Sequence, residues 1–243
     1  MKIFIDSANL HDIEDALKRG FVRGITTNPS LLSKEPKTQF SAHIGKIIEL
    51  IRRFGNGIHL SVEVFSQNPE EILRQANEFR ETFRYEHLSI KVQIGWDELE
   101  AIRKLAADGF SVNCTCCMTV SQAAMAAAAG ARYVSLFWGR IRDSANPGHA
   151  VTHAAAIEKG ALDEKDASPH EVVRAVRMLL DRSYPNVEII AGSIRKVTDV
   201  RDAALAGAHI VTVPPKFFPD MISHFKTDEV IAQFLSDFKN WMS

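Results

Sequence analysis

Polar side chains of a reactive kind recur at one end of several short apolar segments. In the segment 88–93, alternation puts Lys91 on the face opposite Leu88, Ile90 and Val92. Other segments place further polar residues near their ends in the same way: Asp6, Asn28, Glu63, Asn113 and Thr115. A lysine surrounded by acids, amides and a hydroxyl can form a Schiff base with a carbonyl compound, provided that it reacts as the neutral amine.

Lys91 also has a structural alternative, in which it is only the cation of a buried ion-pair network. Five polar neighbours from different segments favour a reactive site, because a core that needed only stability would carry Val or Leu at these positions. Desolvation favours the neutral amine, whereas carboxylates such as Asp6 and Glu63 favour the ammonium form. The sequence leaves this balance open.

One pattern recurs in the elements that must position these residues. An amphipathic helix ends in small residues and a glycine, and a short apolar segment follows; the glycines are Gly20, Gly109, Gly130 and Gly207. Each can end its helix in the left-handed conformation. Further strands are predicted at 58–65, 88–93 and 187–191, and helices at 69–84, 96–107 and 169–182. With a first strand at 2–6, the pattern predicts eight strands.

Strands that alternate with helices at this density predict parallel pairing through right-handed crossovers. A closed (β/α)8 TIM barrel fits better than an open doubly wound sheet, partly because no G-x-G-x-x-G motif follows the first strand. In a barrel the apolar strand faces pack outward, so the polar faces point inward. Their C-terminal ends form the face where barrel enzymes build their sites. Phe4 is expected to fill the opposite end, with His59 as a hydrogen-bonded filler.

The barrel is predicted to be one domain over residues 1–243, without a linker. From about residue 216 a helical extension follows, with a helix at 228–241 that covers the barrel or meets a partner. The segment 144–167 is rich in Gly, Ala, His and charge and is expected to be a long loop after the sixth strand.

Composition excludes several classes of function. The chain has 243 residues, of which 46% are hydrophobic, and its 29 basic and 30 acidic side chains give a net charge of -1. No basic cluster stands apart, so nucleic acid is excluded as a partner. The N-terminus meets Asp6 too early for a signal sequence, and no segment approaches a membrane span, which predicts a cytoplasmic protein. Cys114, Cys116 and Cys117 lack zinc spacing and are expected as buried, reduced thiols in a core strand.

Seven motifs follow the order and context of the transaldolase family, which also contains the fructose 6-phosphate aldolases. The resemblance runs from residue 1 to about residue 238, and T-T-N-P-S is its most specific part. The motifs are F-I-D at Asp6, T-T-N-P-S at 26–30, V-E-V around Glu63, I-K-V around Lys91, N-x-T at 113–115, S-x-F-x-G-R at 135–140 and A-x-S-x-R at 191–195.

This resemblance implies a Schiff-base reaction without a cofactor. Lys91 would condense with the C2 carbonyl of a ketose, and Asp6 would take the C4 hydroxyl proton as the C3–C4 bond breaks. Glu63 and Thr115 would position the water lost and regained at the Schiff base. The dihydroxyacetone unit would stay on Lys91 as an enamine until an aldehyde acceptor arrives.

The resemblance also implies the substrate contacts. Asn28 and Asn113 would hold hydroxyls of the dihydroxyacetone unit, while Arg140, Ser193 and Arg195 would clamp the sugar phosphate. Charge-assisted bonds from two guanidiniums suit a tetrahedral oxyanion. The matching motifs add Thr26, Ser135 and Phe137 to the substrate-binding residues. Sugar phosphates are thus the expected partners, in the pentose phosphate pathway, and a homo-oligomer is expected.

Glu63 and Phe137 resemble the transaldolase branch, whereas the aldolases tend to carry Gln and Tyr, so transfer is favoured over cleavage that releases dihydroxyacetone. Gln93, Arg142 and the segment 144–167 depart from the family pattern, which leaves a sulfo-sugar or a biosynthetic sugar open as substrate. Two other classes also stay open. One is a non-catalytic sugar-phosphate-binding barrel, and the other is a metal-dependent aldolase that uses His149 and His153, although no metal site is expected.

Overall fold

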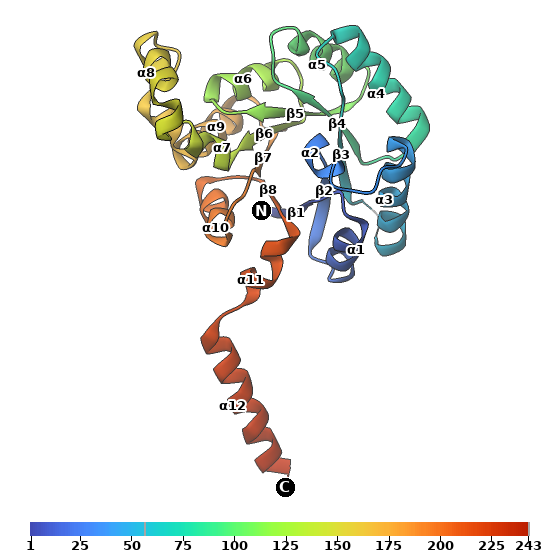
Figure 1. Ribbon diagram of the computed structural model, residues 1–243, viewed down its shortest axis with the longest axis vertical. Helices are drawn as coiled ribbons and strands as arrows, with labels where there is room; N and C mark the ends of the chain where they lie inside the picture. The colour runs from blue at the N-terminus through green and yellow to red at the C-terminus, as the bar shows by residue number, and fades with distance from the viewer. Residues whose placement is uncertain (56, 243) are drawn as a thin grey trace.

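The computed structural model describes residues 1–55 and 57–242, and within them the strands close into a parallel barrel in chain order, β1 to β8 (Figure 1). The strands are β1 (Lys2–Asp6), β2 (Val22–Thr26), β3 (His59–Glu63), β4 (Leu88–Gln93), β5 (Ser111–Cys117), β6 (Tyr133–Phe137), β7 (Glu188–Gly192) and β8 (Ile210–Val213). The last strand pairs with the first, from Lys2 against Ile210 onward. The predicted (β/α)8 TIM barrel is therefore confirmed.

Helices follow the strands in the order that the sequence predicts. They are α1 (Leu10–Lys18), α2 (Pro29–Leu32), α3 (Phe40–Phe54), α4 (Pro69–Phe83), α5 (Glu98–Ala107), α6 (Val120–Ala128), α7 (Trp138–Asp143), α8 (Ala150–Glu158), α9 (Pro169–Ser183), α10 (Val197–Ala206), α11 (Phe218–Ile222) and α12 (Phe225–Met242). Short 3₁₀ helices form at η1 (Pro147–His149), η2 (Glu164–Ala167) and η3 (Pro215–Phe217). The helix-ending glycines Gly20, Gly109, Gly130 and Gly207 all have positive φ, from 72° to 108°.

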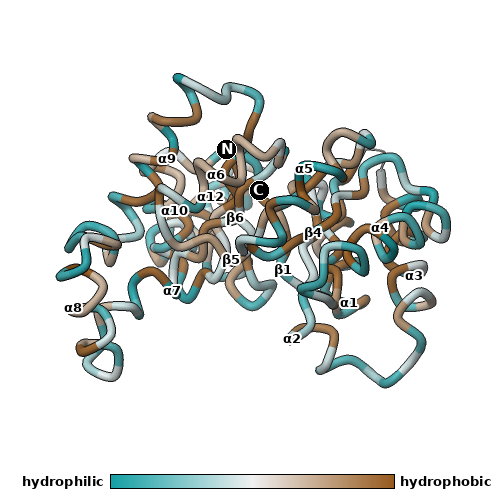
Figure 2. Tube along the Cα trace, turned by 90° about the horizontal axis from the view of Figure 1, so that it is seen from above, coloured by the Kyte–Doolittle hydropathy of each residue, from teal (hydrophilic) through white to brown (hydrophobic). Residues whose placement is uncertain are grey.

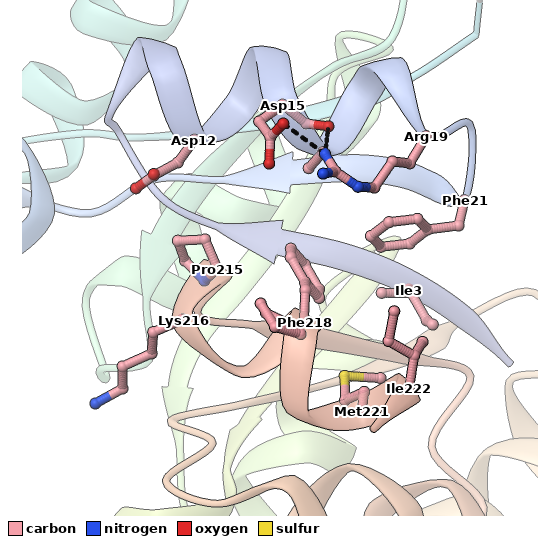
Figure 3. Close-up of a pocket in the computed structure, with 12 residues that line it drawn as sticks. Ile3, Asp12, Asp15, Arg19, Phe21, Pro215, Lys216, Phe218, Met221 and Ile222 are labelled. Carbon is pink, nitrogen blue, oxygen red and sulfur yellow. Dashed lines mark hydrogen bonds and ion pairs between the residues drawn. The ribbon is translucent and has the colours of Figure 1, made fainter. Parts of the chain in front are cut away.

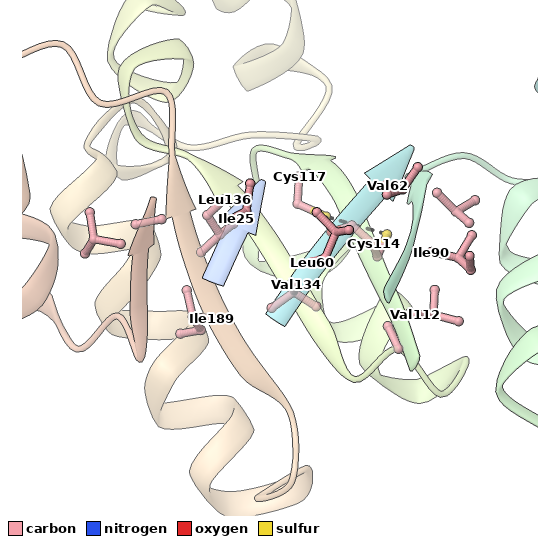
Figure 4. Packing of buried hydrophobic residues seen from close by; sticks show 14 of the residues in the cluster. Ile25, Leu60, Val62, Ile90, Val112, Cys114, Cys117, Val134, Leu136 and Ile189 are labelled. Carbon is pink, nitrogen blue, oxygen red and sulfur yellow. Dashed lines mark hydrogen bonds between the residues drawn. The ribbon is translucent and has the colours of Figure 1, made fainter. Parts of the chain in front are cut away.

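The main hydrophobic core lies between the barrel and the surrounding helices (Figure 4). Ile25, Leu60, Val112 and Val134, from four different strands, are fully buried there. Along the chain trace, hydrophobic positions gather toward the strands and hydrophilic ones toward the outer loops (Figure 2). This arrangement leaves the inward strand faces free to carry polar groups.

Aromatic rings fill the N-terminal end of the barrel. Phe4 stacks on His59 with ring centroids 5.0 Å apart, and Tyr133 meets His59 edge-on at 4.8 Å. The Phe4 ring lies over Gly24, where an added Cβ would come within 2.5 Å of it. His59 bonds Ser61 at 2.6 Å, so both expected fillers of the barrel are confirmed.

The segment 144–167 differs from the prediction, because it forms η1, α8 and η2 instead of a long loop. Alanines at 150 and 154–156 give α8 high helix propensity despite the neighbouring polar residues. Gly160, at φ +67°, follows the end of this helix. No residue of α8 is buried, so local propensity decides its structure more than packing does.

The C-terminal helix does not cover the barrel, so the first of the two predicted alternatives is wrong. In Figure 1, α12 projects away from the barrel beyond α11, and none of its described residues is buried. An apolar groove of about 670 Å³ lies between α1 and the η3–α11 segment. Phe21, Phe218, Met221 and Ile222 line this groove (Figure 3).

Candidate active site

A cavity of about 420 Å³ opens at the C-terminal ends of the strands, the face on which the sequence places the reactive residues. Most of the predicted site residues line it: Asp6, Thr26, Asn28, Glu63, Lys91, Thr115, Ser135, Phe137, Arg140 and Ser193. They come from strands and loops all around the barrel. The closure of the sheet therefore brings these residues together.

Lys91 lies buried at the side of this cavity, with 5% of its surface exposed. Its Nζ atom pairs with Glu63 Oε2 at 2.9 Å and donates to the backbone oxygen of Thr27 at 3.0 Å. Glu63 and Lys91 stand directly opposite each other in the β3–β4 pairing. The strand register thus fixes the amine beside one carboxylate.

Asp6 ends β1 and faces the same cavity. Its Oδ1 atom accepts a hydrogen bond from Thr26 Oγ1 at 2.8 Å, and the Thr212 hydroxyl lies 2.5 Å from that of Thr26. Because Thr26 gives its proton to Asp6, Thr212 must donate to Thr26. Burial raises the pKa of Asp6 above 3.8. Lys91 and the hydrogen bond from Thr26 lower this pKa, whereas the charge of Glu63 raises it further. A carboxyl with a raised pKa is a better general base near neutral pH.

Thr115 lines the cavity from the inward face of β5, and only 1% of its surface is exposed. Its Oγ1 atom has no hydrogen-bond partner among the described residues. A buried hydroxyl without a partner is costly unless water or a ligand bonds to it. The cavity therefore has a polar position ready for a water molecule or a substrate hydroxyl.

Asn28 explains the local structure of the T-T-N-P-S motif. Its Oδ1 atom accepts from the backbone nitrogen of Leu31 at 3.0 Å and caps α2, while Pro29 occupies the first helical position. Within the described chain nothing bonds its Nδ2 atom, although Asn28 lines the cavity. The cap fixes the side chain and leaves the amide nitrogen to a ligand.

Asn113 does not line the cavity, and its contact with substrate stays a prediction. It is fully buried deeper in the barrel, where its Nδ2 donates to Ser61 Oγ at 3.0 Å and its Oδ1 accepts from Ser135 Oγ at 2.7 Å. Asn113 thus contacts Ser135, which itself lines the cavity.

The predicted anion clamp is divided. Arg140, exposed on α7, lines the cavity together with Ser193, which has φ +58°. Arg195 lies outside it and forms an ion pair with Asp143, Nη1 to Oδ1 at 2.7 Å. This pair lowers the pKa of Asp143. The Arg195–Asp143 pair connects the loop after β7 to α7. The same loop comes so close to α7 that position 139 must be glycine, since a Cβ there would lie 2.5 Å from the Ser193 backbone oxygen.

Thr212 and Cys116 are among the cavity residues that were missed from the sequence. Thr212 could have been found, because it stands between Val211 and Val213 as the polar residue of an alternating strand. Cys116 could not, since its thiol reaches the cavity through a register shift between Cys114 and Cys117 and a positive φ of 63°. Only Cys114 and Cys117 are buried in the core as expected.

Two further features lie away from the cavity. His149 and His153 are in η1 and α8 and do not line it. In residues 1–55 and 57–242, no three His, Cys, Asp or Glu side chains gather in a group that could hold a metal ion. Across the same residues, no helix has the length and apolar character needed to cross a membrane.

Comparisons with known proteins find similar sequences over nearly the whole chain. The family model described as transaldolase/fructose-6-phosphate aldolase matches residues 3–242. The chain is 34% identical over 239 residues to a probable transaldolase of Alkaliphilus metalliredigens, with 98% of both chains covered. It is 34% identical to one of Symbiobacterium thermophilum, over 98% of this chain and 97% of that protein, and 33% identical to one of Clostridium perfringens, with the same coverage. The protein therefore belongs to the transaldolase/fructose-6-phosphate aldolase family.

Proposed function

We propose that this protein is a transaldolase that moves a dihydroxyacetone unit from a ketose phosphate to an aldose through a Schiff base on Lys91. One arrangement carries the proposal: a buried lysine pairs with Glu63 beside the unbonded hydroxyl of Thr115, and Asp6 faces the same cavity. The enzyme class follows from the family, whereas the substrates and the mechanism are the proposal.

Schiff-base formation starts when the neutral Lys91 amine attacks the C2 carbonyl of the ketose. Glu63, 2.9 Å from Nζ, first takes a proton from the Lys91 ammonium and so frees the amine. After the attack a second proton passes from nitrogen to the former carbonyl oxygen, and Glu63 then gives its proton to the departing hydroxyl. The carbinolamine then loses water, and the Thr115 hydroxyl holds this molecule because it has no other partner in the described chain. The products of this stage are an iminium ion and one water molecule.

Carbon–carbon cleavage then uses Asp6. Its carboxylate takes the proton of the C4 hydroxyl, the C3–C4 bond breaks, and the electron pair moves into the iminium to give an enamine. The aldose leaves, and an acceptor aldehyde takes its place. In the reverse sequence the enamine attacks this aldehyde, and Asp6 returns the proton to the new hydroxyl.

At the open side of the cavity, Arg140 and Ser193 bind the anionic tail of the sugar. Arg195 supports this side through its pair with Asp143, and that pair must open before Arg195 can contact the phosphate. A sulfonate presents a similar tetrahedral arrangement of oxygens, so the tail is part of what the experiment tests.

Borohydride trapping with fructose 6-phosphate tests the proposal, followed by intact and peptide mass spectrometry. We expect a reduced dihydroxyacetone adduct on Lys91 that is absent in Lys91→Ala and retained in Lys104→Ala, a lysine on the outer helix α5. Product analysis with and without an aldose phosphate acceptor then separates transfer from release of dihydroxyacetone.

A non-catalytic sugar-phosphate-binding barrel is the second candidate, and the short ion pair between Lys91 and Glu63 favours it. In that protein Lys91 is a permanent structural cation. If phosphorylated and sulfonated ketoses bind the protein but none of them forms an adduct, this candidate is established instead.

We also infer that the chain forms a homo-oligomer through α12. Phe234, Leu235, Phe238 and Trp241 share one side of this helix and are 59% to 78% exposed. An apolar helix face of this kind marks an interaction site, and a second copy of the chain offers the matching apolar surface at the α1–α11 groove. The cytoplasmic location and the pathway stay predictions.

A further inference from the structure

A chain of hydrogen bonds crosses the barrel interior, from the cavity to the opposite end. Ser135 Oγ lies 2.7 Å from Asn113 Oδ1, Asn113 Nδ2 lies 3.0 Å from Ser61 Oγ, and Ser61 Oγ lies 2.6 Å from His59 Nε2. All four side chains are buried, and His59, at 8%, is the most exposed of them. Only Ser135 lines the candidate active site.

Donor and acceptor rules favour one direction for this chain. The Ser135 hydroxyl donates to the amide oxygen of Asn113, whose NH2 group donates to Ser61. Ser61 has one hydroxyl hydrogen, and His59 Nε2 is the one other group within hydrogen-bond distance of Ser61 Oγ among the described residues. Donation to Nε2 therefore leaves no buried hydroxyl hydrogen without an acceptor. Since Nε2 accepts, the proton of the neutral imidazole is on Nδ1. In the opposite arrangement the Asn113 amide is turned, so that its NH2 group donates to Ser135, its oxygen accepts from Ser61, and Ser61 accepts from a protonated Nε2.

The surroundings of His59 keep its ring neutral. Phe4 and Tyr133 enclose it, and burial, with the positive charges of Lys2, His87 and Arg132, lowers its pKa to about 3. On its other side the ring lines a cavity of about 300 Å³ at the N-terminal end of the barrel. Among the described residues Nδ1 has no partner, so the Nδ1 proton can bond solvent there.

We propose that His59 and Ser61 are positioning residues that fix Ser135 as a hydrogen-bond acceptor toward the substrate. The inference rests on the proposed transaldolase function and deepens it. With its own proton committed to Asn113, Ser135 offers the cavity only lone pairs. It therefore selects a donor at this position, a free hydroxyl of the dihydroxyacetone unit, over a carbonyl or ether oxygen.

Nitrogen-15 NMR of histidine-labelled protein tests the direction, with the His59 signals assigned by their loss in His59→Gln. We expect an unprotonated Nε2 and a protonated Nδ1. Ser135→Ala should shift the His59 signals although the two side chains do not touch. Ser89→Ala is the matched control, because Ser89 is equally buried but bonds Ser111 outside this chain. A protonated Nε2 in the wild type would overturn the proposal.

Kinetics of the transfer reaction test the consequence. Ser61→Ala leaves the Asn113 NH2 group without its partner, and we expect kcat/KM for the ketose donor to fall roughly tenfold, with KM for the aldose acceptor unchanged. Ser89→Ala should keep both constants. Equal losses for donor and acceptor would instead indicate general damage to the barrel and refute a positioning role.

The two proposals fail separately. If the wild type forms no borohydride adduct, the proposed transaldolase reaction fails, while the NMR experiment still reports the direction of the hydrogen bonds. If the adduct forms and Nε2 is protonated, only the inference about His59 and Ser61 fails.

Discussion

At the scale of single residues, Asp6 shows how neighbours set the state of a candidate base. Burial raises its pKa, while Lys91 and the Thr26 hydroxyl lower it, and burial outweighs both. The Thr26 bond is the one of these influences that a single isosteric substitution removes. It stabilises the ionised carboxylate, which is the form that accepts the substrate proton.

Thr26→Val should raise the pKa of Asp6 further. Activity needs the carboxylate form of Asp6, so activity is lost as pH falls through this pKa. The acid limb of kcat/KM should therefore move to higher pH by roughly one unit. Thr27→Val is the control, since the Thr27 hydroxyl bonds the backbone oxygen of Ser61 and not Asp6. A limb that stays in place would show that Asp6 does not govern it.

His59 makes stability depend on pH in a known direction. The unfolded chain binds a proton at this residue below its ordinary pKa of 6.5, but the folded protein does so only near 3. Lowering the pH from 7 to 5 therefore favours unfolding, by about 2 kcal/mol from His59. The contribution is complete above pH 6.5 and is lost progressively between 6.5 and 3.

Urea unfolding at pH 7 and pH 5 measures this effect. The loss of free energy of unfolding should be smaller in His59→Gln than in the wild type by about the same 2 kcal/mol. The exposed His11 serves as the comparison, and His11→Gln should keep the wild-type difference. Equal pH dependence in all three proteins would contradict the buried, neutral state of His59.

At the scale of elements, two glycines have different reasons to be glycine. Gly24 in β2 has an ordinary φ, but the Phe4 ring occupies the space of its missing side chain. That ring cannot move aside freely, because it stacks on His59. Gly45 in α3 has no atom within 4 Å of the position of a Cβ. One glycine is thus required by packing and the other is not.

Gly24→Ala should reduce the free energy of unfolding by about 1–3 kcal/mol, because the added methyl group overpacks the barrel interior. Gly45→Ala should instead stabilise the protein by up to about 1 kcal/mol through helix propensity. Urea denaturation of the two variants gives both values. If Gly24→Ala has the same effect as Gly45→Ala, or is as stable as the wild type, the close contact with Phe4 is refuted.

At the scale of the whole molecule, α12 is the part that the barrel leaves without a partner. The hydrophobic side of this helix contrasts with the barrel helices, whose apolar faces are buried in the core. A second copy of the chain can cover this side, with the α1–α11 groove as its counterpart. Assembly then depends on the apolar stripe and not on the polar side of α12.

Phe234→Glu combined with Leu235→Glu should lower the molar mass in sedimentation or light-scattering measurements, because burying two carboxylates in an apolar contact is costly. Ser236→Glu, on the opposite side of the helix, should leave the mass of the assembly unchanged. An unchanged mass in the double variant, or a monomeric wild type, would refute assembly through this face.

Much of the fold and of the candidate site was predictable from sequence, because it depends on local periodicity. Alternation in β4 puts Lys91 inward, small residues and Gly207 end α10, and the motif at 26–30 contains its own helix cap in Asn28. The order of alternating strands and helices then predicts the closed barrel, since parallel strands with right-handed crossovers leave few other topologies.

Only the tertiary structure decided which polar groups reach the cavity. A bulge turns Cys116 toward it, depth in the barrel withholds Asn113, and the ion pair with Asp143 holds Arg195 outside. Local propensity also made α8 from residues that looked irregular. Period-2 alternation assigns a side chain to a face, but not its depth along the barrel or its choice among neighbours. Those depend on the register and stagger of closed strands, which distant parts of the chain set together.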